Sequence, residues 1–261
     1  MNSSKSKGFR SIVIALFVSF GFLAPGSMMA QDATEIIKKA NDKMEGISSE
    51  VEMVMTVVRP TWQRTVSFRS WAKGRDYSLT LIIAPAKESG QTFLKLKNDM
   101  WSWNPTINRM IKLPPSMMSQ GWMGSDYSND DILKESSIVV DYTHTIIGSE
   151  IVQEFNCYKI QLDPKEEAAV VWGKILIWIS KEELYQLKVE YYDEDDYLVK
   201  THLLSDIKFM YDRKIPTHFE IIPEDKPNQK TLVDIKNVRF DIKIPDNFFS
   251  QQNMKYPDKQ P

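Results

Sequence analysis

Alternation of apolar and polar residues with a period of two is the feature that most constrains the fold of this chain. It begins near Val51, where Val51, Met53, Met55 and Val57 alternate with a more polar set, as in a strand with one buried face. Similar runs follow at residues 65–71, 77–83, 92–96, 100–103, 107–112, 143–151, 158–162, 174–180, 187–192, 198–208, 217–222 and 230–238. No helices alternate with these runs, so the pattern argues against a parallel sheet. We expect one large, curved antiparallel sheet.

One amphipathic helix is expected before the first strand. The residues on its apolar face are Ile36, Ile37, Ala40, Met44 and Ile47. Asp32 or Thr34 is available as the N-cap, and Gly46 lies near the end. A curved sheet that approaches a barrel must fill its concave side, and this helix is the obvious plug. The predicted fold class is mainly β with α, as an incomplete β-barrel.

The strand pattern is interrupted at residues 113–137. This segment contains two prolines and two glycines, and an acidic stretch at 129–135 predicts a short helix capped by Ser128. We expect it to form an elaborated loop between two halves of one sheet. Since no Gly/Ser/Pro-rich linker or fixed repeat follows, residues 31–250 are interpreted as one domain, with a polar, flexible tail at 251–261.

The N-terminus predicts export. Lys5, Lys7 and Arg10 precede an apolar run at 12–24, and a cut after Ala30 fits a secretory signal peptide at residues 1–30. The run is shorter than the roughly 20 residues that span a bilayer, although an uncleaved anchor is the alternative. A lipoprotein signal needs a cysteine at the cut, which this chain lacks. The expected location is the periplasm.

The net charge and the cysteine content further reduce the number of possible functions. Removal of residues 1–30 takes three of the 33 basic residues and none of the 35 acidic ones, which leaves 30 against 35 and a net charge of −5. That balance argues against nucleic-acid binding. The single cysteine, Cys157, allows no internal disulfide and is interpreted as a small buried side chain.

Tryptophan and methionine are concentrated at residues 100–123. Trp101 and Trp103 share one face of a strand because side chains at i and i+2 point the same way. Methionines surround Trp122, and methionine adapts to variable apolar partners. Core packing and the wall of a hydrophobic cavity are equally good interpretations. The candidate cavity-lining residues are Met53, Met55, Trp101, Trp103, Met110, Met117, Met118, Trp122 and Met123.

No catalytic or metal-binding pattern competes with this interpretation. His144, His202 and His218 lack metal-ligand spacing, and the acidic run at 193–196 is typical of a solvated turn rather than a calcium loop. Ser125 lacks the G-x-S-x-G elbow. We predict neither an enzyme nor a need for a metal or cofactor.

Several segments resemble the LolA-like periplasmic carriers, and in particular their branch of outer-membrane lipoprotein-sorting proteins. They are the opening DATEIIKKANDKMEGISS, the turn in MWSWNPTINRMIKLP, WISKEELYQLKVEYYDEDDYLVK, IPTHFEIIPEDKPNQKTLVDIKNV and the closing IPDNFF. The resemblance implies an incomplete barrel with a helical and loop lid, which accepts acyl chains of lipoproteins or other lipids from an inner-membrane exporter of the ABC or RND type. It further implies a monomer that delivers them to an outer-membrane acceptor.

In carriers of this kind, an arginine of an early strand holds the lid through hydrogen bonds to backbone. The resemblance offers Arg75 for this role, with Arg64 or Arg69 as substitutes. Two other functions stay open at this point: a periplasmic binding module of similar fold that senses lipids and docks on a signalling protein, and an envelope hydrolase, which the residues support least.

Overall fold

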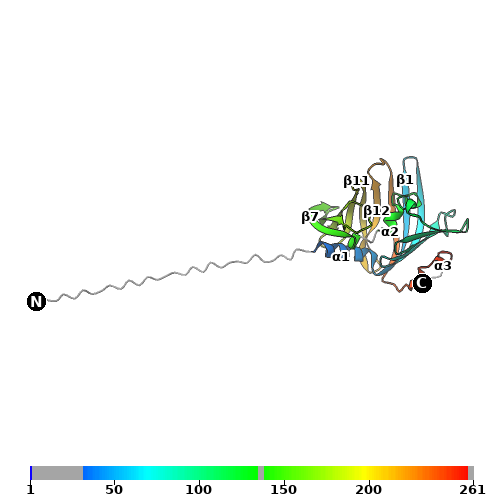
Figure 1. Ribbon diagram of the computed structural model, residues 1–261, viewed down its shortest axis with the longest axis horizontal. Helices are drawn as coiled ribbons and strands as arrows, with labels where there is room; N and C mark the ends of the chain where they lie inside the picture. Colours follow the sequence, from blue (N-terminus) through cyan, green and yellow to red (C-terminus); the bar gives the residue numbers. More distant parts are fainter. Residues whose placement is uncertain (2–31, 135–137, 258–261) are drawn as a thin grey trace. The chain divides into compact units, whose positions relative to one another are not determined.

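The computed structural model describes Met1 and residues 32–134 and 138–257. The predicted signal peptide, apart from Met1, therefore lies outside the described residues. Within the part that is described, thirteen strands form one antiparallel sheet in the order β6-β5-β4-β3-β2-β1-β13-β12-β11-β10-β9-β8-β7. The sheet is curved and open, because β6 and β7 are edges that do not pair with each other (Figure 1). The predicted fold class is confirmed.

Two meanders make up this sheet. The strands of the first are β1 (Ser48–Arg59), β2 (Trp62–Lys73), β3 (Tyr77–Ala84), β4 (Thr92–Leu96), β5 (Asp99–Asn104) and β6 (Arg109–Lys112). The strands of the second are β7 (Tyr142–Val152), β8 (Phe155–Pro164), β9 (Lys174–Ser180), β10 (Gln186–Tyr192), β11 (Leu198–Met210), β12 (Arg213–Pro223) and β13 (Lys230–Phe240). Pairing of β1 with β13 joins them into one surface.

Helix α1 (Ala33–Glu45) matches the predicted amphipathic helix. Asp32 caps it by accepting a hydrogen bond from the Thr34 backbone N–H at 2.9 Å. The helix contacts β7, β9 and β12, and its buried face belongs to one apolar cluster with Ile160 of β8 and with Ile175 and Ile177 of β9. Ile47, expected on this face, lies beyond the helix end and is exposed. The helix therefore covers the second meander and leaves much of the first uncovered (Figure 1).

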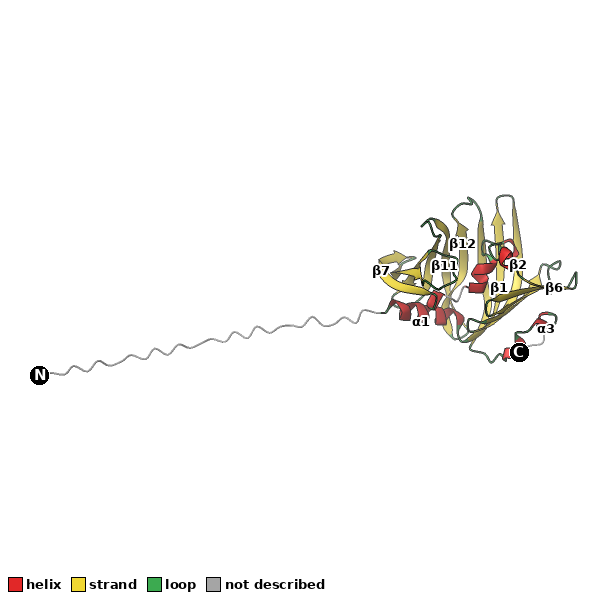
Figure 2. Ribbon diagram, viewed as in Figure 1, coloured by secondary structure: helices red, strands yellow, loops and turns green. Residues whose placement is uncertain are grey.

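The segment at 113–134 covers part of the first meander on its concave side (Figure 2). It contains η1 (Pro115–Met117), η2 (Trp122–Gly124) and α2 (Asn129–Lys134). Ser128 caps α2 as predicted, because its Oγ accepts from the Asp131 N–H at 3.0 Å while its own N–H donates to Asp131 Oδ2 at 2.7 Å. The underside of this segment packs on Met55, Phe68 and Val233 of the sheet. We call residues 113–134 the lid.

The C-terminal segment covers the opposite, convex face of the first meander. Its elements are η4 (Asp246–Phe248) and α3 (Gln251–Met254). Met254 is fully buried, and its carbonyl accepts a hydrogen bond from Thr92 Oγ1 at 2.9 Å. The flexible tail predicted from residue 251 is thus wrong for its first residues, because burial of Met254 anchors them to the sheet; residues 258–261 lie outside the described part.

Candidate functional site

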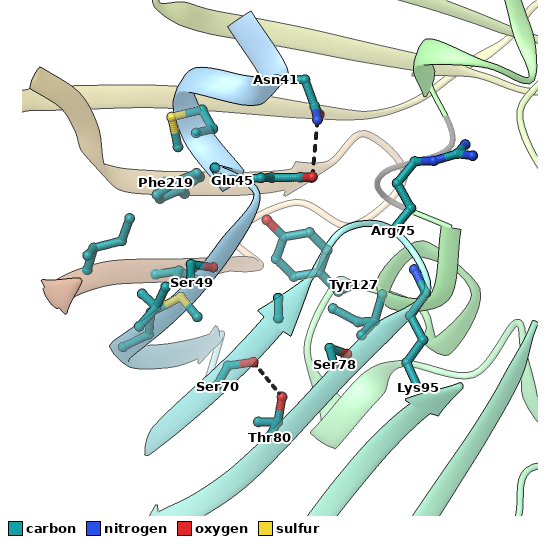
Figure 3. A pocket seen from close by; sticks show the side chains of 18 of the residues that line it. Asn41, Glu45, Ser49, Ser70, Arg75, Ser78, Thr80, Lys95, Tyr127 and Phe219 are labelled. Atoms are coloured by element: carbon teal, nitrogen blue, oxygen red, sulfur yellow. Dashed lines mark hydrogen bonds between the residues drawn. The ribbon is translucent and has the colours of Figure 1, made fainter. Parts of the chain in front are cut away.

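A cavity of about 320 Å³ opens on the concave side of the sheet (Figure 3). It is bounded by the end of α1, by β1 to β4 and by parts of β9 to β13, with the lid at one end. This volume lies at the lower end of the roughly 300–1,000 Å³ of small-molecule pockets. The cavity is therefore large enough to hold part of an organic ligand.

One part of the cavity wall is apolar. Met53 and Met55 reach it from β1 because residues at i and i+2 share a strand face. Trp122 closes this part from the lid, and its ring packs edge-on against Phe68 at 5.5 Å between centroids. The remaining apolar lining residues include Met44, Val51, Ile132, Ile138, Ile175, Ile177, Leu204, Phe219, Val233 and Ile235. Such a surface is suited to hydrocarbon.

Another part of the wall is polar. Ser49, Ser70, Ser78 and Thr80 line it from β1, β2 and β3 (Figure 3). The hydroxyls of Ser70 and Thr80 are hydrogen-bonded across the two strands at 2.9 Å. The cavity is thus divided between a hydroxyl-bearing wall and an apolar one.

Three of the described lining residues carry a formal charge: Glu45, Arg75 and Lys95. Burial raises the pKa of Glu45, while a hydrogen bond from Asn41 Nδ2 at 3.1 Å and the positive charges of Lys95 and Arg75 oppose that rise. Arg75 belongs to the turn between β2 and β3, and Lys95 to β4. Positive charge therefore exceeds negative charge in this lining.

His202 of β11 lies at the side of the cavity near the lid. Its ring packs against Tyr127 at 5.2 Å and Tyr191 at 4.7 Å between centroids. Burial lowers the pKa of His202 to about 3, with a smaller contribution from the Lys200 ammonium. Among the described residues, Nε2 of this ring has no hydrogen-bond partner. The imidazole is accordingly neutral at physiological pH.

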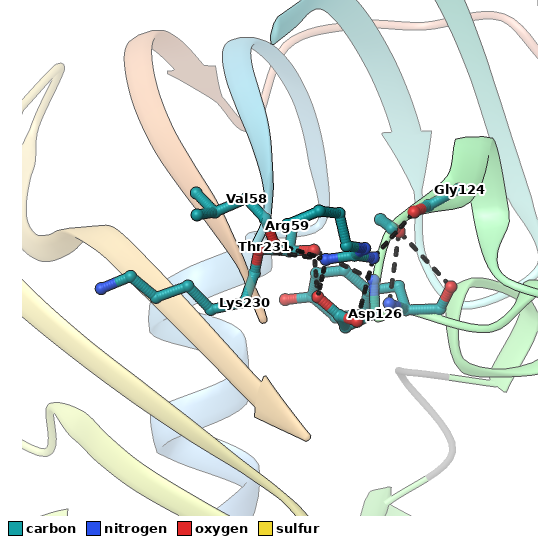
Figure 4. A network of polar contacts seen from close by, with 8 residues as sticks. Val58, Arg59, Gly124, Asp126, Lys230 and Thr231 are labelled. Carbon is teal, nitrogen blue, oxygen red and sulfur yellow. Dashed lines mark hydrogen bonds and ion pairs between the residues drawn. The ribbon is translucent and has the colours of Figure 1, made fainter. Parts of the chain in front are cut away.

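The lid is fixed to the sheet by a buried ion pair (Figure 4). Arg59, the last residue of β1, donates from Nη1 to Asp126 Oδ2 at 3.0 Å and from Nη2 to Asp126 Oδ1 at 3.1 Å. The same guanidinium donates to the carbonyl of Gly124 at 2.9 Å. Thr231 Oγ1 also donates to Asp126, at 2.7 Å, and accepts from the Asp126 N–H. This network joins the lid to β1 and β13.

Of the three arginines predicted to hold the lid, Arg64 contacts it. Its Nη1 donates to the carbonyl of Met123 at 2.8 Å, and its other terminal nitrogen pairs with Glu88. Arg69 instead pairs with Glu52, next to it on β1. Arg75 lines the cavity and makes no hydrogen bond to the lid among the described residues. We did not predict Arg59 as a residue that holds the lid, although its position at the end of a strand, directly before Pro60, could have indicated it.

The structure brings some of the predicted lining residues together and separates others. Met53, Met55 and Trp122 line the cavity, and Met118 and Met123 pack in the cluster beneath the lid. Met117 lies in η1, half-buried and outside the cavity lining.

Trp101, Trp103 and Met110 lie on the convex face. Trp101 stands opposite Leu94 in the β4–β5 register, and Leu94 stands opposite Leu79 in the β3–β4 register. All of these pack with the C-terminal segment rather than with the cavity. The two tryptophans share a face as predicted, but it is not the face that lines the cavity.

The side chains that could act in catalysis or bind a metal are not grouped together in the described residues. Within the described residues, no three His, Cys, Asp or Glu side chains are grouped so that they could hold a metal ion. His144 contacts Thr34 and the Ile138 carbonyl, whereas His218 pairs with Asp234. Burial raises the pKa of the Cys157 thiol, which disfavours the reactive thiolate. In the described part of the chain, none of the helices has the length and apolar character needed to cross a bilayer.

Comparison with known proteins identifies the family and the fold of this chain. A family model that describes an uncharacterized protein matches residues 74–256. A DUF1329 family protein from Desulfovibrio piger is similar in structure, with a TM-score of 0.77 and 25% identity over 85% of this chain and 97% of that one. No protein of curated function matches the sequence.

Two further crystal structures share the fold. One is a putative outer membrane lipoprotein-sorting protein domain from Vibrio parahaemolyticus, with a TM-score of 0.74 and 21% identity over 85% of this chain and 98% of that one. The other is a LolA superfamily protein from Nitrosomonas europaea, with a TM-score of 0.73 and 22% identity over 85% and 99%. The chain therefore belongs to the family whose model matches residues 74–256, and its fold is that of the LolA-like proteins.

Proposed function

We propose that this protein is a carrier that binds acyl chains of lipoproteins or other lipids in its cavity and moves them through the periplasm from the inner to the outer membrane. The observation that carries the proposal is the cavity itself, which lies between an open sheet, α1 and the lid and has an apolar wall. Each methylene transferred from water into such a site contributes about 0.8 kcal/mol. Binding and release of a hydrocarbon tail require no catalytic group.

The lid gives the carrier a means of exchange. Its underside presents Trp122, Met118 and Met123 to the sheet, and these adaptable side chains would cover an acyl chain as readily as they cover one another. Arg59 and Arg64 hold it through its backbone carbonyls and through Asp126. Lys200 of β11 also pairs with Asp131 of the lid, so exchange of cargo would require these contacts to break and re-form together.

The partners in this proposal follow from the family likeness. An inner-membrane exporter of the ABC or RND type would load the carrier, which acts as a monomer, and an outer-membrane acceptor would unload it. The predicted signal peptide at residues 1–30 would bring the chain to that compartment.

A cavity-filling substitution tests the proposal. Ala72 lines the cavity on β2, whereas Ala169 lies exposed in a loop. We expect Ala72→Phe to reduce the uptake of a pyrene-labelled diacyl lipid from vesicles several-fold, because the added ring occupies the volume that the chains need. The matched control Ala169→Phe should bind like the unsubstituted protein.

Circular dichroism would show that both variants are folded. Equal uptake by folded Ala72→Phe, or no uptake by the unsubstituted protein, would contradict the carrier function. Uptake without any transfer to acceptor vesicles would favour the sensing module instead.

A further inference from the structure

The polar wall of the cavity is the starting point for a more specific conclusion. Ser49 and Ser78 line it, and their hydroxyls make no hydrogen bond to another described residue. If a hydrocarbon covered these groups, they would lose their bonds to water and gain none, at a cost of about 1–3 kcal/mol each. A ligand that fills the cavity favourably must therefore carry polar atoms at this wall.

The charged residues of the lining indicate whether the polar part of the ligand is anionic or cationic. Arg75 and Lys95 lie on the same side of the cavity, beside the hydroxyl-bearing strands (Figure 3). Glu45 is the acidic member of the described lining, and it lies across from them at the end of α1. Two cations against one carboxylate favour an anion, and a guanidinium is well suited to bind phosphate or carboxylate oxygens.

The apolar part of the wall accounts for the rest of the ligand. Met53, Met55 and Phe68 continue the cavity away from the charged side, towards Trp122 of the lid. A molecule that satisfies both parts is an amphiphile with an anionic end and one or more hydrocarbon chains. A free anion would leave the apolar part unused, and a neutral lipid would leave the cations without a partner in the ligand.

We propose that the cargo of this cavity is a lipid with an anionic head group, whose phosphate or carboxylate is bound by Arg75 and Lys95 beside the serines while its chains lie against Met53, Met55 and Phe68. This inference rests on the proposed carrier function and narrows its cargo.

Matched lipids test it. We would measure binding of phosphatidylglycerol and of diacylglycerol with identical acyl chains, which lacks the phosphate, and of inorganic phosphate alone, by the protein of residues 31–261 at low ionic strength. The variant is Arg75→Gln with Lys95→Gln. Its control is Lys208→Gln with Lys236→Gln, which removes the same charge from two exposed lysines outside the cavity lining.

The expected result is a preference for phosphatidylglycerol of about tenfold, equal to about 1.4 kcal/mol, which the Arg75/Lys95 variant loses and the control keeps. Added salt should weaken the preference, because the side chains lie at the open side of the cavity. Equal binding of the two lipids, or a preference that survives in the variant, would overturn the inference while leaving the carrier function intact.

Two other results would also count against it. Binding of inorganic phosphate that depends on Arg75 and Lys95, with no lipid bound, would identify a site for the free anion. Absence of binding for both lipids would instead refute the carrier function, and this inference with it.

Discussion

Replacement of Arg59 should release the lid without unfolding the sheet. The Arg59 side chain is 13% exposed and that of Asp126 is 4% exposed, so the pair is largely removed from water. Arg59→Met keeps the aliphatic stem but removes two bonds to Asp126 and one to the Gly124 carbonyl. Asp126 would keep Thr231 as a partner but would lose its opposite charge.

The size of the effect follows from that burial. Loss of one partner from a buried ion pair costs about 3–5 kcal/mol, because the other charge stays buried and uncompensated. The closed lid bears this cost, whereas the open lid returns Asp126 to water. The free energy of lid opening should therefore fall by about 3 kcal/mol, which corresponds to a roughly hundredfold rise in the open population.

Hydrogen exchange measures this population directly. The amide of Asp126 donates to Thr231 Oγ1 of β13 at 3.0 Å, so it reports separation of the lid from the sheet. We expect it to exchange roughly a hundredfold faster in Arg59→Met, while amides of β9 change little.

Arg69→Met is the matched control, because Arg69 pairs with Glu52 on β1 and does not contact the lid. Unchanged exchange of the Asp126 amide in Arg59→Met would refute the latch. Equal acceleration in the lid and in β9 would refute it as well, since that pattern indicates global destabilisation.

Three further substitutions have defined outcomes. The pKa of His202 is lowered to about 3, so below about pH 6.5 the unfolded chain binds a proton at this residue that the folded chain does not bind. Denaturant titrations should therefore show that the unsubstituted protein loses about 2 kcal/mol of stability between pH 7 and pH 5, whereas His202→Gln does not. The same pH dependence of stability in both proteins would contradict this. Burial raises the pKa of Glu45, so Glu45→Gln should be more stable than the unsubstituted protein at pH 7. The difference in stability should become smaller as the pH falls towards 4.5. A difference that does not change with pH would show that the raised pKa of Glu45 is not its cause. Trp103→Ala should cost about 3–5 kcal/mol of unfolding free energy yet leave lipid uptake by the folded protein unchanged, because Trp103 packs on the convex face; a selective loss of uptake would place it in the binding path.

The strands were predictable because a period of two is a local property of the sequence. Val51, Met53 and Met55 alternate as the strand requires, and all three line the cavity. The same reasoning showed that Trp101 and Trp103 share a face, but not which face. That choice depends on the C-terminal segment, more than 130 residues further along the chain, which buries Phe248 and Phe249 against the tryptophan side of the sheet. A long-range contact of this kind leaves no local pattern.

The position of the cavity has a similar cause. Helix α1 was predicted as the plug of the barrel, and its apolar face does pack inside the curved sheet. Ile36 and Ile37, however, meet the isoleucines of β8 and β9, whereas Trp122 of the lid meets Phe68 and Val66 of β2. Each element covers only the strands that its own apolar face reaches. The strip between them, on β1 to β3, carries serines that line the cavity. The cavity is thus the part of the concave face that two separate covers leave open, and its hydroxyl-bearing wall is a consequence of that division.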